Sequence, residues 1–308
     1  MMNKIIAIQG DHPSKLNPLT DTSVFLAIEI QKRGYSIFYY EPKNLSILNA
    51  NLIANGFFIR FNYKTKKFYK ILKKKKLNLI NCKFLLVRQD PPFNLQYITS
   101  LYMLDTIKEK INIINNPTSI RNVSEKLYSV RYLKFMPKTI FTQSINEIQK
   151  FLKMHKKVIL KPIHGHSGND IYLLDKFNLN LIKRIINKHN HIMCQEYLPK
   201  IYMGDKRVFL IDGKISGAIS RVPKKGSFLS NMSKGAVPKN TILTKKEIII
   251  SKLIGKNLKK ENIFFAGIDL IDEKLSGDIN VTSPTGLKTF YDLSKINLAK
   301  TFWERLKA

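Results

Sequence analysis

The chain has 308 residues, enough for two domains, and 44% of them are hydrophobic, which indicates a globular protein. Its 53 lysine and arginine residues against 22 aspartate and glutamate residues give a net charge of +31, but the lysines are spread over nearly the whole chain. This scatter argues against a dedicated nucleic-acid partner. No apolar run of about 18 residues or more occurs, so the sequence predicts no membrane span.

The two cysteines give no sign of a metal site or a disulfide framework. Cys82 and Cys194 are far apart and neither belongs to a Cys-x-x-Cys pair. The apolar run at residues 4–8 is too short for a signal peptide and is followed by a polar loop. These features predict a protein of a reducing compartment, the cytoplasm.

Residues 4–40 predict a β-α-β unit with a parallel sheet. An apolar strand is followed by a polar loop, and Asp21 at the end of that loop is suited to cap a helix that stops at Gly34. An apolar, aromatic run at residues 35–40 then predicts a second strand. The unit contains no Gly-x-Gly-x-x-Gly, so a dinucleotide site is unsupported.

The sequence of the rest of the first domain predicts further strands, each followed by a polar or charged segment. Residues 57–61 read as a strand followed by a basic, solvated amphipathic segment through Lys76, and residues 83–87 as a buried strand. Ligands in open α/β sheets gather at the carboxyl ends of strands, which places Arg88 and Asp90 beside a substrate, unless they simply pair with each other. A helix at residues 98–110 and a strand at 111–114 complete a domain that ends near residue 120.

One segment after the first domain favours phosphate binding. A helical stretch is predicted at residues 119–129, and a later strand at 157–162 carries Lys161 near its end, just before the small-residue loop 164–169. Backbone N–H groups of such a loop can surround phosphate oxygens beside a lysine, although a plain hairpin turn has the same composition. We interpret His164 and His166 as loop residues rather than zinc ligands or catalysts.

Further strands are predicted at residues 191–194, 204–213 and 218–223. The following loop, residues 226–235, has the Gly, Ser and Lys content of a mobile lid over an anion, with a disordered surface loop as the alternative. Helices are expected at residues 244–258 and 298–306.

Acidic and amide side chains recur along residues 269–285. Alternation along a strand puts Asp278 and Asn280 on one face, and a hairpin turning through residues 273–277 would bring Asp269 opposite them. Three such oxygen donors suit Mg²⁺, which takes its remaining ligands from water and substrate phosphates. An ordinary exposed hairpin with outward polar residues is the alternative.

Taken together, these segments resemble the ATP-grasp superfamily, and in particular the bacterial glutathione synthetases, over nearly the whole chain. The motifs that carry the resemblance are Arg88-Gln89-Asp90-Pro91-Pro92-Phe93, Asn115-Asn116-Pro117, Glu125-Lys126-Leu127, Leu160-Lys161-Pro162, Gly204-Asp205-Lys206-Arg207, Arg221-Val222-Pro223 with Gly226 and Asn231, Gly267-Ile268-Asp269, and Asp278-Ile279-Asn280-Val281-Thr282-Ser283-Pro284-Thr285. The arginine-acid-diproline motif and the Asn-Val-Thr-Ser-Pro-Thr turn are the narrowest.

The resemblance implies an α/β fold of two domains. An N-terminal Rossmann-like, pre-ATP-grasp domain with a parallel sheet would span residues 1–120. An ATP-grasp catalytic domain of two α+β subdomains would span residues 121–308, with a small lobe at about 130–200 and a mobile lid at about 223–240.

The resemblance also implies roles for individual residues. Arg207 and Arg221 would be the catalytic residues, which neutralise the negative charges of the γ-phosphate and of the substrate carboxylate. The implied ATP-binding residues are Lys126, Lys161, Gly165, Ser167, Gly168, Gln195, Glu196, Tyr197 and Leu198. The implied substrate-binding residues are Arg88, Asp90, Asn231, Thr282, Ser283 and Thr285. The implied ligands of Mg²⁺, with Mn²⁺ as the alternative ion, are Asp269, Asp278 and Asn280.

The implied reaction phosphorylates γ-glutamylcysteine with ATP to an acyl phosphate, which glycine attacks to give glutathione. The resemblance further implies a homo-oligomer, commonly a tetramer. Two alternatives remain open: another ATP-grasp carboxylate–amine ligase with different substrates, and a non-catalytic basic binding protein that has kept the fold.

This sequence departs from the family pattern at three positions. The metal motif, usually Glu-x-Asn, has the shorter Asp278, and one extra residue separates it from Asp269. The phosphate loop has one acid and one glycine fewer than the common Asp-Gly-x-Gly-Gly. The usual Gly-Gly pair of the lid is Gly235-Ala236.

Overall fold

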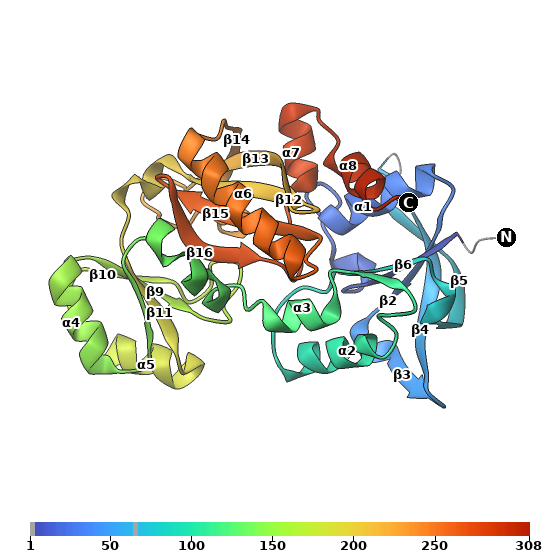
Figure 1. Ribbon diagram of the computed structural model, residues 1–308, viewed down its shortest axis with the longest axis horizontal. Coiled ribbons are helices and arrows are strands. Elements are labelled where there is room, and N and C mark those ends of the chain that lie inside the picture. Colours follow the sequence, from blue (N-terminus) through green and yellow to red (C-terminus); the bar gives the residue numbers. More distant parts are fainter. Residues whose placement is uncertain (1–3, 64–66) are drawn as a thin grey trace.

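The computed structural model describes residues 4–63 and 67–308 and has a mixed α/β architecture. Its β-strands form a seven-stranded, a four-stranded and a five-stranded sheet. In Figure 1 the five-stranded sheet lies between the other two, and the C-terminal end lies close to α1. The predicted α/β class is therefore confirmed.

The first part of the chain forms the seven-stranded sheet. Its strands are β1 (Ile5–Gln9), β2 (Ser36–Tyr40), β3 (Leu45–Leu48), β4 (Asn51–Phe61), β5 (Tyr69–Asn78), β6 (Phe84–Val87) and β7 (Asn112–Ile114). Its helices are α1 (Thr22–Lys32), α2 (Leu95–Asp105) and α3 (Pro117–Asn122). Strands β2, β1, β6 and β7 are parallel neighbours, as the β-α-β prediction requires. The predicted cap is also present, because the Asp21 carboxylate accepts the Val24 N–H of α1 at 2.8 Å.

Two predictions for this part need correction. The basic segment through Lys76 is not a separate amphipathic element, because β5 pairs antiparallel with β4 as a hairpin; its lysine side chains are nevertheless exposed, as expected. The helix predicted at 98–110 begins earlier and ends earlier, as α2. Asn94 accepts the Tyr97 N–H at 3.0 Å and so sets its start.

The four-stranded antiparallel sheet and two helices form a small lobe at one end of the molecule (Figure 1). Its elements are β8 (Thr139–Thr142), α4 (Ile145–His155), β9 (Val158–Pro162), β10 (Tyr172–Leu174), α5 (Leu179–His189) and β11 (Ile192–Glu196). One apolar cluster joins both helices to the sheet and includes Cys194. Cys82 belongs to a different cluster, beneath α2.

The five-stranded antiparallel sheet has the order β14-β13-β12-β15-β16. The elements of this last part are β12 (Asp205–Ile211), β13 (Lys214–Val222), β14 (Val237–Asn240), α6 (Lys245–Lys260), β15 (Phe265–Ile271), β16 (Lys274–Asn280), α7 (Leu287–Ser294) and α8 (Leu298–Arg305). The short 3-10 helices of the chain are η1 (Pro13–Lys15), η2 (Pro42–Asn44), η3 (Leu79–Asn81), η4 (Leu127–Phe135), η5 (Pro199–Met203) and η6 (Met232–Lys234).

The N-terminal sheet and the five-stranded sheet share a core. Side chains of α1, α7 and α8 meet those of both sheets in one apolar cluster, where the Trp303 indole donates to the Leu26 carbonyl at 2.9 Å. The Asn115 side chain adds a polar link, because its amide group donates to the carbonyls of Phe265 and Val281 at 2.7 Å each. These contacts hold the two sheets in one arrangement, and the site lies beside them.

Two predictions near the site were also inaccurate. Residues 119–129 are not one helix: α3 ends at Asn122, η4 begins at Leu127, and Glu125 and Lys126 lie in the irregular segment between them. The hairpin does not turn through 273–277, because β16 already begins at Lys274. Within residues 4–63 and 67–308, none of the helices has both the length and the apolar character needed to cross a bilayer.

Candidate active site

A cavity of about 580 Å³ lies where the three sheets and their loops meet. It brings together all but one of the residues predicted to form the site. Those lining it are Asp90, Lys126, Lys161, Gly165, Ser167, Gly168, Gln195, Glu196, Tyr197, Leu198, Arg207, Arg221, Asn231, Asp269, Asp278, Asn280, Thr282, Ser283 and Thr285. They come from segments far apart in sequence, so tertiary structure assembles the site.

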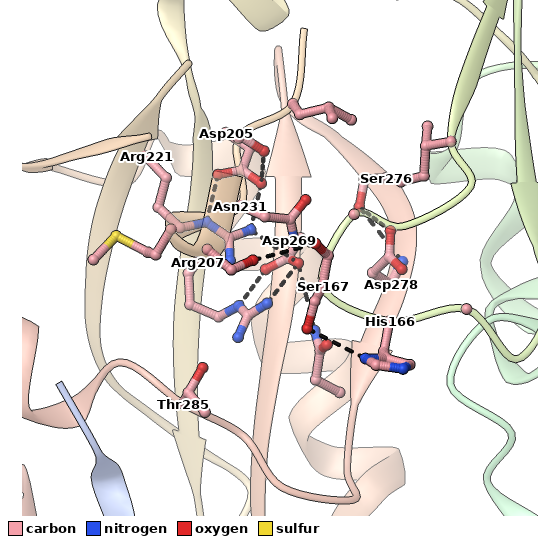
Figure 2. Close-up of a pocket in the computed structure, with 18 of the residues that line it drawn as sticks. His166, Ser167, Asp205, Arg207, Arg221, Asn231, Asp269, Ser276, Asp278 and Thr285 are labelled. Atoms are coloured by element: carbon pink, nitrogen blue, oxygen red, sulfur yellow. Dashed lines mark hydrogen bonds and ion pairs between the residues drawn. The ribbon is translucent and has the colours of Figure 1, made fainter. Parts of the chain in front are cut away.

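The arginines lie on neighbouring strands opposite carboxylates. Arg207 on β12 is the cross-strand partner of Asp269 on β15, and Asp205 on β12 is the partner of Arg221 on β13. Residues 205 and 207 share a face of their strand because side chains alternate. Figure 2 shows both guanidinium groups directed toward Asp269. All four side chains are buried.

The arginine–aspartate contacts form one network. Arg207 holds both oxygens of Asp269, with an Nη2–Oδ2 distance of 2.8 Å, and Arg221 Nη2 reaches the same Oδ2 at 3.0 Å. Arg221 also donates to both oxygens of Asp205, which accepts a further bond from Ser230 at 2.6 Å. Burial alone would raise the pKa of Asp269, but the two arginines outweigh it and hold that pKa below its usual range. We call this group, Asp205, Arg207, Arg221 and Asp269, the arginine cluster.

Two lysines meet on Asp278 from opposite walls of the cavity. Lys126 Nζ lies 3.3 Å from Asp278 Oδ1 and donates to the Gly165 carbonyl at 2.9 Å. Lys161 Nζ lies 3.6 Å from Oδ2 and donates to the Ser276 carbonyl at 2.9 Å. Burial opposes ionisation of Asp278, but the lysines prevail and lower its pKa. We call Lys126, Lys161 and Asp278 the lysine cluster. Its two ammonium groups can bind anionic ligands.

Hard oxygen donors suited to a divalent ion face the same cavity. Asp278 and Asn280 share a face of β16, and the Asn280 amide group donates to Asp269 Oδ2 at 3.4 Å, leaving its own carbonyl oxygen for a cation. Among the residues that the structure describes, no cluster of three or more His, Cys, Asp and Glu side chains could hold a metal. Two carboxylates and an amide fit Mg²⁺ completed by substrate phosphates, rather than an all-protein cage.

The small-residue loop contacts the predicted lid. Ser233 Oγ donates to the Ser167 carbonyl at 3.2 Å, and Lys234 Nζ donates to Asn169 Oδ1 at 2.6 Å. Gly168 has a φ of +73°, and a Cβ atom there would lie 2.6 Å from Asn231 Oδ1. Residues 231–234 therefore lie against the loop, and the glycine permits the close approach.

The segment after β11 forms another wall. Gln195 bridges two sides of it, since its carbonyl accepts from Lys161 Nζ at 3.2 Å and its amide donates to Thr139 Oγ1 at 3.0 Å. The Tyr197 N–H donates to the Lys157 carbonyl at 3.0 Å, which ties the segment to the start of β9. Tyr197 and Leu198 then face the cavity.

Arg88 is the predicted site residue that does not line the main cavity. It is buried, its Nε donates to Ser23 Oγ at 3.0 Å, and it borders a separate space of about 10 Å³. Its backbone carbonyl accepts from Ser283 Oγ at 3.4 Å, so it contacts the back of the turn. Asp90 lines the cavity, and burial raises its pKa despite the charge of Arg88.

Besides Asp21, which was predicted only as a helix cap, sequence reasoning missed two carboxylates of the cavity. Asp205 could have been found by alternation, because it stands two residues before Arg207 in a strand. Glu125 accepts bonds from the backbone N–H groups of Val281 and Thr282. No local pattern announces that contact, because 156 residues separate Glu125 from Val281.

Comparison with known proteins defines first the class and then the family. D-alanyl-alanine synthetase A from Vibrio cholerae O1 biovar eltor str. N16961 shares the fold with a TM-score of 0.65 and 13% identity, covering 100% of this chain and 98% of that one. The model of the ATP-grasp domain of prokaryotic glutathione synthetase matches residues 125–295, and the model of its N-terminal domain matches residues 5–121. The protein is thus an ATP-dependent carbon–nitrogen ligase of the ATP-grasp class, whose members use ATP and divalent metal ions.

Two relatives that match over nearly the whole length of both chains support the same family assignment. Glutathione synthetase of Bradyrhizobium diazoefficiens is 33% identical over 306 residues, covering 98% of this chain and 97% of its own. Glutathione synthetase of Agrobacterium fabrum is 33% identical over 308 residues, with 99% and 96% covered. The chain belongs to the prokaryotic glutathione synthetase family, and the resemblance found in the sequence is confirmed.

Proposed function

We propose that this protein joins γ-glutamylcysteine to glycine in the cavity described above, converting ATP to ADP and phosphate. The observation that carries the proposal is the convergence of two lysines, two arginines and a set of oxygen donors on one space, namely Lys126, Lys161, Arg207, Arg221, Asp269, Asp278 and Asn280. Cations on several walls suit a reaction in which every reacting group, ATP, a carboxylate and an acyl phosphate, is anionic.

ATP would lie between the small lobe and the five-stranded sheet. Lys126 and Lys161 would bind its phosphates, helped by backbone N–H groups of Gly165, Ser167 and Gly168. Adenine would lie against the wall formed by Gln195, Glu196, Tyr197 and Leu198. Support comes from the buried position of both lysines and from the lid contacts that cover the loop.

We assign the metal ligands to Asp269, Asp278 and Asn280, with Mg²⁺ as the ion and Mn²⁺ as the alternative. A divalent ion bound there supplies positive charge against phosphate oxygens. Asp278 has the shorter side chain, yet it lies within 3.3 Å and 3.6 Å of the two lysines, at the centre of the cationic region. This position supports Asp278 as a metal ligand, although its side chain is one methylene shorter than that of the glutamate usual in the family.

Arg207 and Arg221 would stabilise the charge that develops during phosphoryl transfer. A carboxylate oxygen of γ-glutamylcysteine forms a bond to the γ-phosphorus as the bond to ADP breaks. The glycine nitrogen, having lost a proton, then forms the C–N bond, and phosphate leaves with the C–O electron pair. The lid would keep water from the acyl phosphate.

The substrates would be oriented by Asp90, Asn231 and the turn that contains Thr282, Ser283 and Thr285. Arg88 would act from behind this turn, since its carbonyl accepts from Ser283. We also propose a boundary near residue 120 between an N-terminal domain and a catalytic domain, supported by the family models that end at 121 and begin at 125.

Within residues 121–308, we assign the small lobe to about 130–200 and the lid to about 223–240. The four-stranded sheet with its two helices supports the first assignment, and the contacts of Ser233 and Lys234 with the loop support the second. A cytoplasmic location and a tetrameric assembly are further proposals that rest on the two unpaired cysteines and on the family resemblance, respectively.

The test is phosphate release by the purified protein with ATP and Mg²⁺, omitting γ-glutamylcysteine or glycine in turn and identifying the product by mass. Release that requires both substrates and yields glutathione is expected. Release with a different acid and amine pair would replace the substrates proposed here. Replacing Mg²⁺ by Mn²⁺ in the same assay tests the ion.

A further inference from the structure

Glu125 fastens one end of the turn at residues 281–285. Its Oε1 accepts three hydrogen bonds, from the N–H of Val281 at 2.9 Å, the N–H of Thr282 at 3.2 Å and the hydroxyl of Thr282 at 2.9 Å. Its backbone carbonyl also accepts the Ile279 N–H at 3.0 Å. Glu125 therefore joins the end of β16 to the segment that holds Lys126.

The second oxygen of this carboxylate is free. Within residues 4–63 and 67–308, no hydrogen bond or ion pair involves Glu125 Oε2. Glu125 lines both the main cavity and an adjoining space of about 20 Å³, which Phe93, Ser124 and Thr282 also border. A space of that size holds about one water-sized group.

Most other carboxylates that line the main cavity already have a partner; the exception is Asp90, whose carboxylate has none among the described residues. Arginines occupy Asp205 and Asp269, and the two lysines hold Asp278. Asp21 caps α1, and Glu196 accepts the Lys138 N–H at 3.3 Å. Next to the substrate turn, Glu125 thus offers an anionic oxygen for one more donor.

Two hydroxyl groups, one bordering this adjoining space and one behind its Phe93 wall, also have no partner among the described residues. They are the buried hydroxyls of Ser124 and Tyr97. Tyr97 is 3% exposed and packs against Phe93, with ring centroids 5.1 Å apart. Burial raises the pKa of Tyr97, and the charge of Glu125 raises it further. A buried hydroxyl without a hydrogen-bond partner destabilises the folded protein, unless a bound ligand supplies the missing partner.

We propose that Glu125, through Oε2, binds the ammonium group of the incoming amine substrate. Ser124, which borders the same space, supplies a hydroxyl donor for the carboxylate of the same small molecule. The narrow space beside Phe93 favours an amine with little or no side chain. This inference rests on the proposed function, because it names the amine subsite of that same reaction.

The substitution Glu125→Gln tests whether Glu125 acts through its negative charge or only by positioning the turn. Glutamine keeps a carbonyl oxygen that can accept the three bonds from the turn, but it has no charge for the ammonium. We expect the KM for glycine to rise about 10- to 100-fold, the loss typical of a charge-assisted bond. The KM values for ATP and γ-glutamylcysteine should change by less than about threefold. Glu109→Gln, at an exposed glutamate, is the matched control and should leave all three values unchanged.

A second measurement follows the acyl phosphate itself. Hydroxylamine, which is uncharged at neutral pH, traps acyl phosphates as hydroxamates and does not need an ammonium site. Glu125→Gln should therefore form hydroxamate from ATP and γ-glutamylcysteine at close to the wild-type rate. Thr282→Val, which removes one bond of the turn but leaves the carboxylate, should raise the glycine KM less than Glu125→Gln does.

Two results would overturn the inference: an unchanged glycine KM in Glu125→Gln, or KM values for all three substrates that rise together, which would make Glu125 a positioning residue only. A wild-type protein that forms hydroxamate with γ-glutamylcysteine but does not use glycine would overturn the amine assignment. Failure of the wild type to form hydroxamate at all would instead remove the proposed function.

Discussion

The arginine cluster and the lysine cluster both pair cations with carboxylates, yet they are built differently. In the arginine cluster, all four side chains stand on three neighbouring strands, and strand register puts each arginine opposite an aspartate. In the lysine cluster, Lys126 lies in an irregular segment and Lys161 near the end of β9, and they meet a single carboxylate.

This difference in construction predicts that substitutions in the two clusters have different effects. Bidentate arginine pairs on a sheet have fixed geometry, and breaking one leaves a buried charge unpaired. Lysine is a flexible point charge that can move from Asp278 to a phosphate. We therefore expect changes in the arginine cluster to affect folding and activity together, and changes in the lysine cluster to affect ligand binding more than folding.

The largest effect is expected from Asp269→Asn. The substitution leaves Arg207 with a weaker partner in a buried place and removes a proposed metal ligand, so we expect a loss of about 3–5 kcal/mol in the free energy of unfolding. Activity should fall by about 100-fold or more. Denaturant unfolding and phosphate release measure the two effects. Asp272→Asn, at an exposed ion pair with Lys200, should change stability by about 0.5 kcal/mol or less. A wild-type unfolding midpoint in Asp269→Asn would contradict the fixed role of the arginine cluster.

Lys161→Met should separate binding from folding. Asp278 keeps Lys126 at 3.3 Å and the Ser276 hydroxyl at 3.3 Å, so the free energy of unfolding should fall by only about 1 kcal/mol. The KM for ATP should rise about 10-fold or more, because the proposed charge-assisted contact with phosphate is lost. Lys183→Met, at an exposed position of α5, serves as the control. Destabilisation as large as that of Asp269→Asn would remove the contrast between the two clusters.

Gly168→Ala tests the contact between the loop and the lid. Alanine is strained at a φ of +73°, and its Cβ would lie 2.6 Å from Asn231 Oδ1. We expect about 1–2 kcal/mol of destabilisation from the backbone alone and a weaker affinity for ATP, measured by calorimetry. Gly226→Ala has a similar φ of +79° with nothing within 4 Å, so it reproduces the strain without the clash. Equal ATP affinities in the two variants would show that the lid contact is unimportant.

The smallest effect is expected from Asp170→Asn, at a residue that does not itself line the cavity. Hydrogen bonds from Lys188 and His189 hold the pKa of Asp170 below its usual value. A lowered folded-state pKa stabilises the protein above the ordinary carboxyl range, and this contribution is lost as the pH falls toward the folded-state pKa. The side chain is 25% exposed, so the variant should lose only about 0.5 kcal/mol near neutral pH, and the difference should shrink below about pH 4. Urea unfolding at both pH values measures it; a difference that grows in acid would contradict the sign.

Local sequence patterns predicted much of the fold. Alternation along β16 put Asp278 and Asn280 on one face, Asp21 was recognised as a helix cap, and the first β-α-β unit formed as expected. These features depend on residues a few positions apart, so short-range backbone geometry decides them. The family motifs added the residues of the candidate site, and nearly all of them line one cavity.

Local patterns failed where a segment takes its conformation from distant contacts. A helix was predicted through Glu125 and Lys126, but hydrogen bonds to residues 281 and 282 hold Glu125 in an irregular segment instead. Arg88 was expected in the main cavity, but Ser23, 65 residues earlier, holds its side chain elsewhere.

The sequence by itself therefore determined the elements, their caps and the types of residue available for phosphate and metal chemistry. Only the tertiary structure decided that Arg207 stands opposite Asp269, 62 residues away, and that one oxygen of Glu125 has no partner among the described residues beside the turn. The physical reason is that strand register and burial arise from the packing of the whole chain, and these set which charges are paired and which are left for a ligand.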